Sequence, residues 1–82
     1  MKTNLNTEYA RKCLPNKLDS CRIAMKLGQQ ENERVFCIHA AKYLEALKRS
    51  HNANECALAA RIDRFLYDRD YDAAIQALEG RR

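Results

Sequence analysis

Residues 31–50 read ENERVFCIHAAKYLEALKRS, and this stretch decides the fold class. Its apolar side chains recur every three or four residues, as they do along one face of an α-helix. The recurring positions are Phe36, Ala40, Tyr43, Leu44 and Leu47. Acidic residues open the stretch and basic residues close it, which suits the dipole of a helix. Val35 and Ile38 widen the apolar face, so we expect a central helix with neighbours on two sides.

Shorter apolar patterns on both sides of this stretch predict further helices over residues 7–14, 16–27, 53–67 and 71–79. Pro15 separates the first two, because proline disfavours helical geometry in the residue before it. Gly28 suits the left-handed turn that closes a helix. Asn52 with Glu55 three residues later matches a capping box, and Asp70 is expected to cap the last helix. The sequence therefore predicts an all-α fold, a compact antiparallel bundle of four to five helices.

The composition agrees with one small helical unit. The 82 residues include 12 Ala and 9 Leu, against 7 of the β-branched Val, Ile and Thr, and Ala and Leu are the stronger helix formers. Residues 1–5 are polar and are expected to form a flexible N-terminus, with residues 6–82 as a single helical domain. The first residues lack the apolar core of a secretion signal, and no apolar run approaches the ~20 residues that span a bilayer. We therefore expect a cytoplasmic protein without a membrane segment.

Charge is the one global feature that points to a partner. The net charge of +4 arises entirely within residues 1–30, where six Lys and Arg face two acidic residues. Such a surplus attracts phosphates or an acidic protein surface. The predicted partner-binding residues are Tyr9, Arg11, Lys12, Lys17, Arg22 and Lys26.

No catalytic motif accompanies this charge, and a chain of this length has little room for both a core and a deep pocket. We therefore expect a non-enzymatic interaction protein, an adaptor, regulator or inhibitor, that binds a protein partner. A nucleic-acid-binding regulator that uses the same basic residues is one alternative. A structural homodimer, joined through the apolar face of residues 35–47, is the other.

The four cysteines and two histidines are the candidate metal ligands of the sequence. Cys13, Cys21, Cys37 and Cys56 include no pair separated by two to four residues, the spacing typical of zinc sites. We therefore expect neither a metal nor a cofactor. Cys21 and Cys37 lie eight residues on either side of residue 29. A hairpin that turns there would bring the two thiols to the same level, and the sequence leaves open whether they are bridged.

Overall fold

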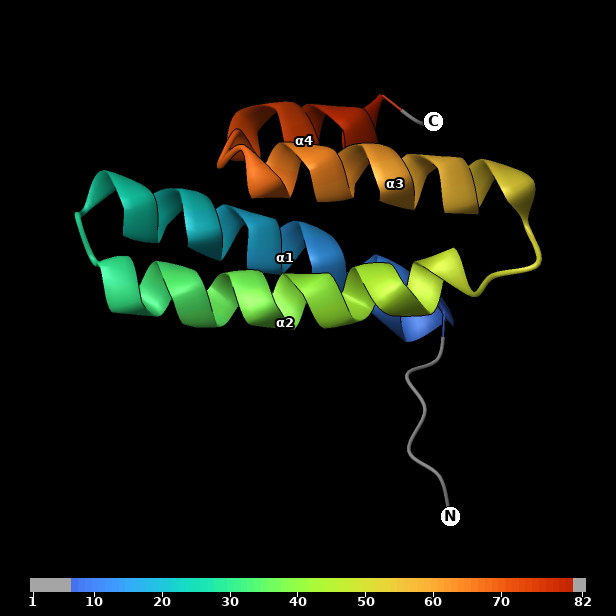
Figure 1. Ribbon diagram of the computed structural model, residues 1–82, viewed down its shortest axis with the longest axis horizontal. Helices are drawn as coiled ribbons and strands as arrows, with labels where there is room; N and C mark the ends of the chain where they lie inside the picture. Colours follow the sequence, from blue (N-terminus) through green and yellow to red (C-terminus); the bar gives the residue numbers. More distant parts are fainter. Residues whose placement is uncertain (1–6, 81–82) are drawn as a thin grey trace, which may run out of the picture.

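The computed structural model describes residues 7–80 as four α-helices. They are α1 (Thr7–Lys26), α2 (Gln30–Lys48), α3 (Ala53–Tyr67) and α4 (Tyr71–Glu79). Each helix packs against the next one along the chain, and α4 also packs against α1, which closes the bundle into a ring. Figure 1 shows the α1–α2 hairpin below and the α3–α4 hairpin above it. The predicted all-α bundle is confirmed, whereas the expectation for residues 1–5 lies outside the described residues.

The predicted break at Pro15 is wrong, because α1 runs without interruption through this residue. Proline removes one backbone hydrogen bond, and it costs a helix interior about 3 kcal/mol relative to alanine. Leu14 and Leu18 on either side are fully buried, and burying each contributes about 1.5–3 kcal/mol. Pro15 itself is exposed. The core contacts on both sides therefore hold the helix together, and Asp19 lies within it instead of in a first turn.

The core is built from small and branched side chains that all four helices contribute. In α1 the buried positions follow one another at intervals of three or four residues through Pro15. The largest fully buried side chains are Leu14, Leu18, Cys21, Leu44, Leu47, Ile62 and Tyr71. Tyr71 comes from the start of α4, so the shortest helix supplies the largest core residue.

The loops use the residues that the sequence marks for them. Gly28 has a φ of 73° and forms the left-handed turn after α1. Asn52 caps α3 by accepting hydrogen bonds from the backbone N–H groups of Asn54 and Glu55, at 2.8 and 3.2 Å. Asp70 caps α4 by accepting from the N–H of Ala73 at 3.2 Å. These predicted ends are confirmed.

The outer side of α2 departs from the prediction. Helices α1 and α3 both contact α2, as expected for a central helix. Val35 and Ile38, however, do not extend the buried face, because both remain about half exposed. The reason is that α1 and α3 meet the face defined by Ala40, Leu44 and Leu47, and they leave the neighbouring face open to solvent.

Candidate functional site

The predicted basic residues do not share one surface. Arg11 forms an ion pair with Glu55 of α3. Arg22 forms ion pairs with Asp19 on its own helix and with Asp72 of α4, the latter at 3.3 Å. The two arginines therefore tie α1 to α3 and α4, and the pKa of Arg22 is raised, mainly by its hydrogen bond to Asp72.

Two other members of the set, Tyr9 and Lys17, contact residues of α2. Lys17 lies over the ring of Phe36 in α2, 5.4 Å from its centroid, which is within range of a cation–π contact. Tyr9 meets Tyr43 of α2 edge to face, with ring centroids 6.2 Å apart. Lys12 and Lys26 are exposed and make no ion pair with another residue between 7 and 80. The structure thus gives Arg11, Lys17 and Arg22 contacts within the chain itself.

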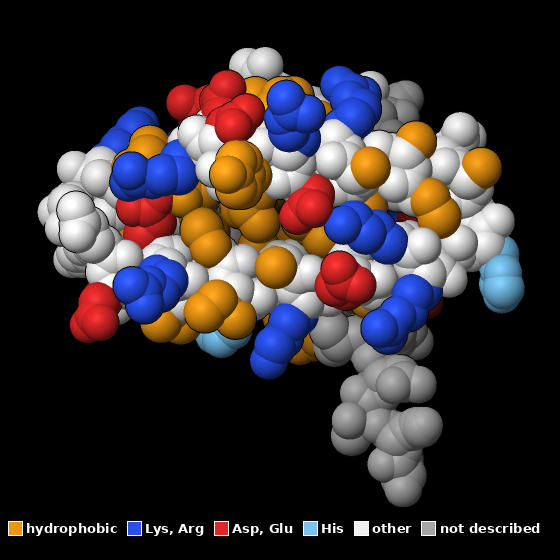
Figure 2. Space-filling model, viewed as in Figure 1, with side chains coloured by type: hydrophobic (Ala, Val, Ile, Leu, Met, Phe, Trp, Pro, Cys, Tyr) orange, Lys and Arg blue, Asp and Glu red, His pale blue; other side chains and the backbone are white. Residues whose placement is uncertain are grey.

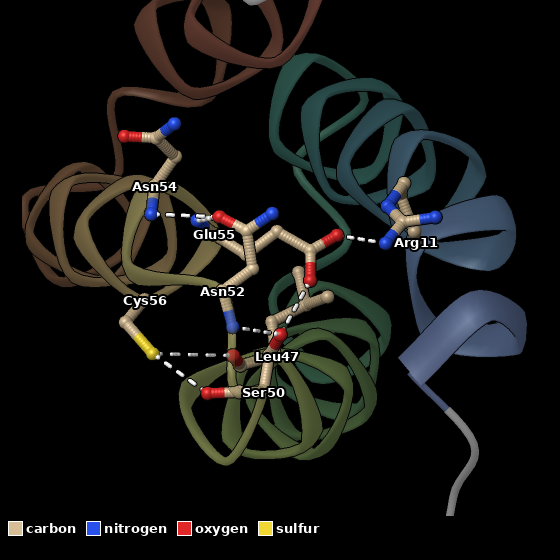
Figure 3. Close-up of polar contacts among 7 residues, drawn as sticks. All are labelled: Arg11, Leu47, Ser50, Asn52, Asn54, Glu55 and Cys56. Carbon is tan, nitrogen blue, oxygen red and sulfur yellow. Dashed lines mark hydrogen bonds and ion pairs between the residues drawn. The ribbon is translucent and has the colours of Figure 1, made fainter.

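A buried carboxylate, Glu55, organises the junction between α2 and α3. Figure 3 shows its side chain between Arg11 of α1 and the loop that precedes α3. Ser50 donates a hydrogen bond to Glu55 at 2.7 Å, and its hydroxyl accepts one from the N–H of Asn52 at 3.0 Å. The capping box is therefore completed through Ser50, whereas the sequence predicted a direct return bond from Glu55 to the cap residue.

Cys56 extends the same junction. Its thiol donates toward the carbonyl oxygen of Lys48, the last residue of α2, at 3.4 Å and toward that of Ser50 in the following loop at 3.2 Å. Because the last carbonyls of a helix have no partner within the helix, the thiol takes the place of a missing backbone donor at Lys48. Glu55 and Cys56 together fix the α2–α3 loop, a structural role that the sequence did not reveal.

A second buried carboxylate, Glu33, lies at the opposite end of the bundle. Arg69 donates two hydrogen bonds to it, from Nε at 2.7 Å and from Nη2 at 2.8 Å, and the hydroxyl of Tyr71 donates a third. The hydrogen bond from Arg69 is the main reason that the pKa of Glu33 lies below its ordinary value. Arg69 has a φ of 59°, unusual for a residue other than glycine. This network locks the α3–α4 turn onto the start of α2.

The thiols of Cys21 and Cys37 adjoin that network. Sγ of Cys37 lies 3.1 Å from the hydroxyl oxygen of Tyr71. Burial, and then the neighbouring Cys37, raise the pKa of the Cys21 thiol to about 12. The α1–α2 hairpin therefore brings the two cysteines together, as the sequence predicted, and both are free thiols.

An open groove lies between α2 and α3, and Cys37 borders both this groove and the network around Glu33. It has a volume of about 620 Å³. Its α2 side is formed by Arg34, Cys37, Ile38 and Ala41, and its α3 side includes Ala60, Asp63, Arg64 and Tyr67. Figure 2 shows hydrophobic side chains gathered in this hollow, with basic and acidic side chains around them.

Two large side chains that line the groove have a high exposed fraction. Tyr67 is 86% exposed and Ile38 is 51% exposed. Two ion pairs lie near these side chains. Nζ of Lys48 lies 3.0 Å from Oδ2 of Asp63, and Nε of Arg64 lies 4.0 Å from Oδ2 of Asp68. Arg34 forms no ion pair within the described part of the chain. The sequence analysis places Ile38 on the widened apolar face of its helix, so its exposure beside the groove is a finding of the structure.

Two features that would indicate another kind of site are absent from the described residues. Between residues 7 and 80, no three His, Cys, Asp or Glu side chains are grouped so that they could hold a metal ion. None of the helices in that same range has both the length and the apolar character to cross a membrane. The groove between α2 and α3 is therefore our candidate functional site.

Comparison with known proteins returned nothing similar: no protein-family model, no curated protein and no solved structure matches this chain.

Proposed function

We propose that this protein is a small, non-enzymatic helical interaction protein that binds a protein partner through the groove between α2 and α3. The observation that carries the proposal is the exposure of Tyr67 and Ile38 beside an open hollow. A large apolar side chain exposed to this degree costs free energy in water, and grouped examples typically mark sites of association. Tyrosine is also among the residues that contribute most to protein interfaces.

The groove supports a protein partner better than the basic residues do. Arg11, Lys17 and Arg22 make contacts inside the bundle, so using them for a partner would require breaking those contacts. Lys12 and Lys26 are exposed on α1, but two cations supply little of the phosphate contact on which nucleic-acid binding depends. In the groove, Arg34 forms no ion pair within residues 7–80, and the exposed side chains of Ile38 and Tyr67 can meet a partner without rearrangement.

A capture experiment with two matched isoleucine variants tests the proposal. Ile38→Ser alters the groove, whereas Ile23→Ser alters α1 outside it, and the two residues are 51% and 48% exposed. Both variants and the original protein are immobilised and exposed to native cell lysate, with and without nuclease. We expect a protein band that survives nuclease, persists with Ile23→Ser and weakens with Ile38→Ser.

The opposite outcomes are equally informative. A band that both variants retain would remove the groove as the contact surface. Bound material that disappears with nuclease would place nucleic-acid binding first and direct attention to Lys12 and Lys26.

A further inference from the structure

We infer that the partner of the groove is a second copy of this chain, in a symmetric dimer where α2 of each copy packs on α3 of the other. The inference rests on the proposed function, because it names the occupant of the same surface. It is carried by the self-complementary shape and charge of the groove.

The groove contains both a projecting side chain and a surface that can receive one. A twofold dimer uses the same surface on both copies, so that surface must contain each projecting group and the hollow that receives it. Tyr67 is the projecting group, since 86% of it is exposed. The surface that receives it is the α2 side of the groove beside Arg34 and Ile38, of which Ile38 is 51% exposed.

The position of each residue along the axis of its helix determines which residues of the two copies meet. Arg34 lies fourteen residues before the end of α2, and Tyr67 lies fourteen residues after the start of α3. Because the two helices are antiparallel neighbours, Arg34 and Tyr67 stand at about the same level on opposite sides of the groove. Rotation about a twofold axis along the groove places α2 over α3 of the other copy and keeps each level unchanged. Arg34 then meets Tyr67 and Asp68 of the second copy.

The charges of these residues are complementary in that arrangement. The guanidinium of Arg34, which has no ion pair within residues 7–80, comes to face the carboxylate of Asp68 from the second copy. That carboxylate is 55% exposed and lies 4.0 Å from Arg64 of its own chain, so it has room to accept from both guanidinium groups. It also gains the face of an aromatic ring, a favourable position for a cation. The apolar side chain of Ile38 comes to lie against the same ring. The exposed groups of the groove thus find partners on an identical surface.

Sedimentation velocity of the full chain over a range of concentrations tests the inference. We expect a concentration-dependent dimer, and Tyr67→Ser should raise its dissociation constant about tenfold or more, as expected for an anchoring interface tyrosine. Leu27→Ser removes another highly exposed apolar side chain, outside the groove, and should leave the dimer unchanged. Circular dichroism of each variant confirms that it is folded.

Reversing the charges at residues 34 and 68 gives a second test of the dimer, one that does not depend on removing apolar surface. Arg34→Asp and Asp68→Arg each place like charges opposite one another twice in a homodimer, so each variant alone should be monomeric. Mixed together, the two variants should form heterodimers, because both contacts become attractive again. This recovery can only occur if residues 34 and 68 of different copies meet.

Three results would overturn the inference. They are a chain that remains monomeric at every concentration, a dimer that Leu27→Ser weakens as much as Tyr67→Ser does, and a charge-exchanged pair that does not associate. If the chain is monomeric while Ile38→Ser still abolishes capture of a lysate protein, the proposed function stands and only the identity of the partner is wrong. The occupant would then be a segment of a different protein.

Discussion

Replacing Tyr71 with phenylalanine removes a single oxygen atom from the core and should lower the free energy of unfolding by about 2 kcal/mol. Tyr71 is only 1% exposed, and its hydroxyl donates to the buried carboxylate of Glu33. A hydrogen bond to a charged group contributes about 1.5–3 kcal/mol. Arg69 retains its two hydrogen bonds to Glu33 in the variant, so the carboxylate is not left without a partner and the loss stays within that range.

Urea denaturation followed by far-UV circular dichroism measures this loss. In a domain of this size a change of 1 kcal/mol shifts the melting temperature by about 4–8 °C, so Tyr71→Phe should melt about 8–16 °C lower. Tyr67→Phe is the matched control, because it removes the same atom from a side chain that is 86% exposed. It should change stability by less than about 0.5 kcal/mol. Equal losses in the two variants would refute the reasoning, as would strict additivity of Tyr71→Phe with Glu33→Gln, because residues in contact should be coupled.

Three further predictions concern Pro15, Asn52 and Glu33. Pro15→Ala restores a backbone donor within α1 at an exposed position. The variant should raise the free energy of unfolding by about 1–3 kcal/mol in urea titrations. A destabilised variant would show that Pro15 suits its position. Asn52→Ala removes the cap of α3 and should cost about 1 kcal/mol by the same assay, whereas an unchanged midpoint would mean that Ser50 alone suffices. The pKa of Glu33 is lowered in the folded state, chiefly by Arg69, so its stabilising effect is complete above the ordinary glutamate pKa of about 4.3 and is lost as the pH falls through the lower folded value. Thermal melts between about pH 6 and pH 3 should therefore show a steeper loss of stability for the original protein than for Glu33→Gln, and parallel curves would contradict this assignment.

The sequence predicted the helices well because their signals are local. The apolar spacing of residues 31–50 and the caps at Asn52 and Asp70 depend on neighbours within one or two turns, so they can be read from the chain itself. The error at Pro15 arose from giving a local rule more weight than the periodicity around it. Leu14 and Leu18 continue one buried stripe through the proline, and that continuity was visible in the sequence.

The site was harder to predict because it depends on contacts between distant residues. Arg11 and Glu55 are 44 positions apart, and Arg69 and Glu33 are 36 apart. No sequence pattern shows that a basic residue will be held by a carboxylate on another helix, so the ion pairs of Arg11 and Arg22 could not be predicted. The groove was missed for the same reason, because the exposure of Ile38 depends on how α1 and α3 cover α2.

The contact between α1 and α4 has a consequence for how the protein is made. A ring that closes between its first and last helices cannot be completed during synthesis until α4 has left the ribosome. Until then the growing chain presents the surfaces of α1 and α3 that α4 will cover, and Glu33 lacks the tyrosine that later donates to it. The α1–α2 hairpin involves nearby residues and can form early. The ring of helices is therefore complete only after the nine residues of α4 have been synthesised.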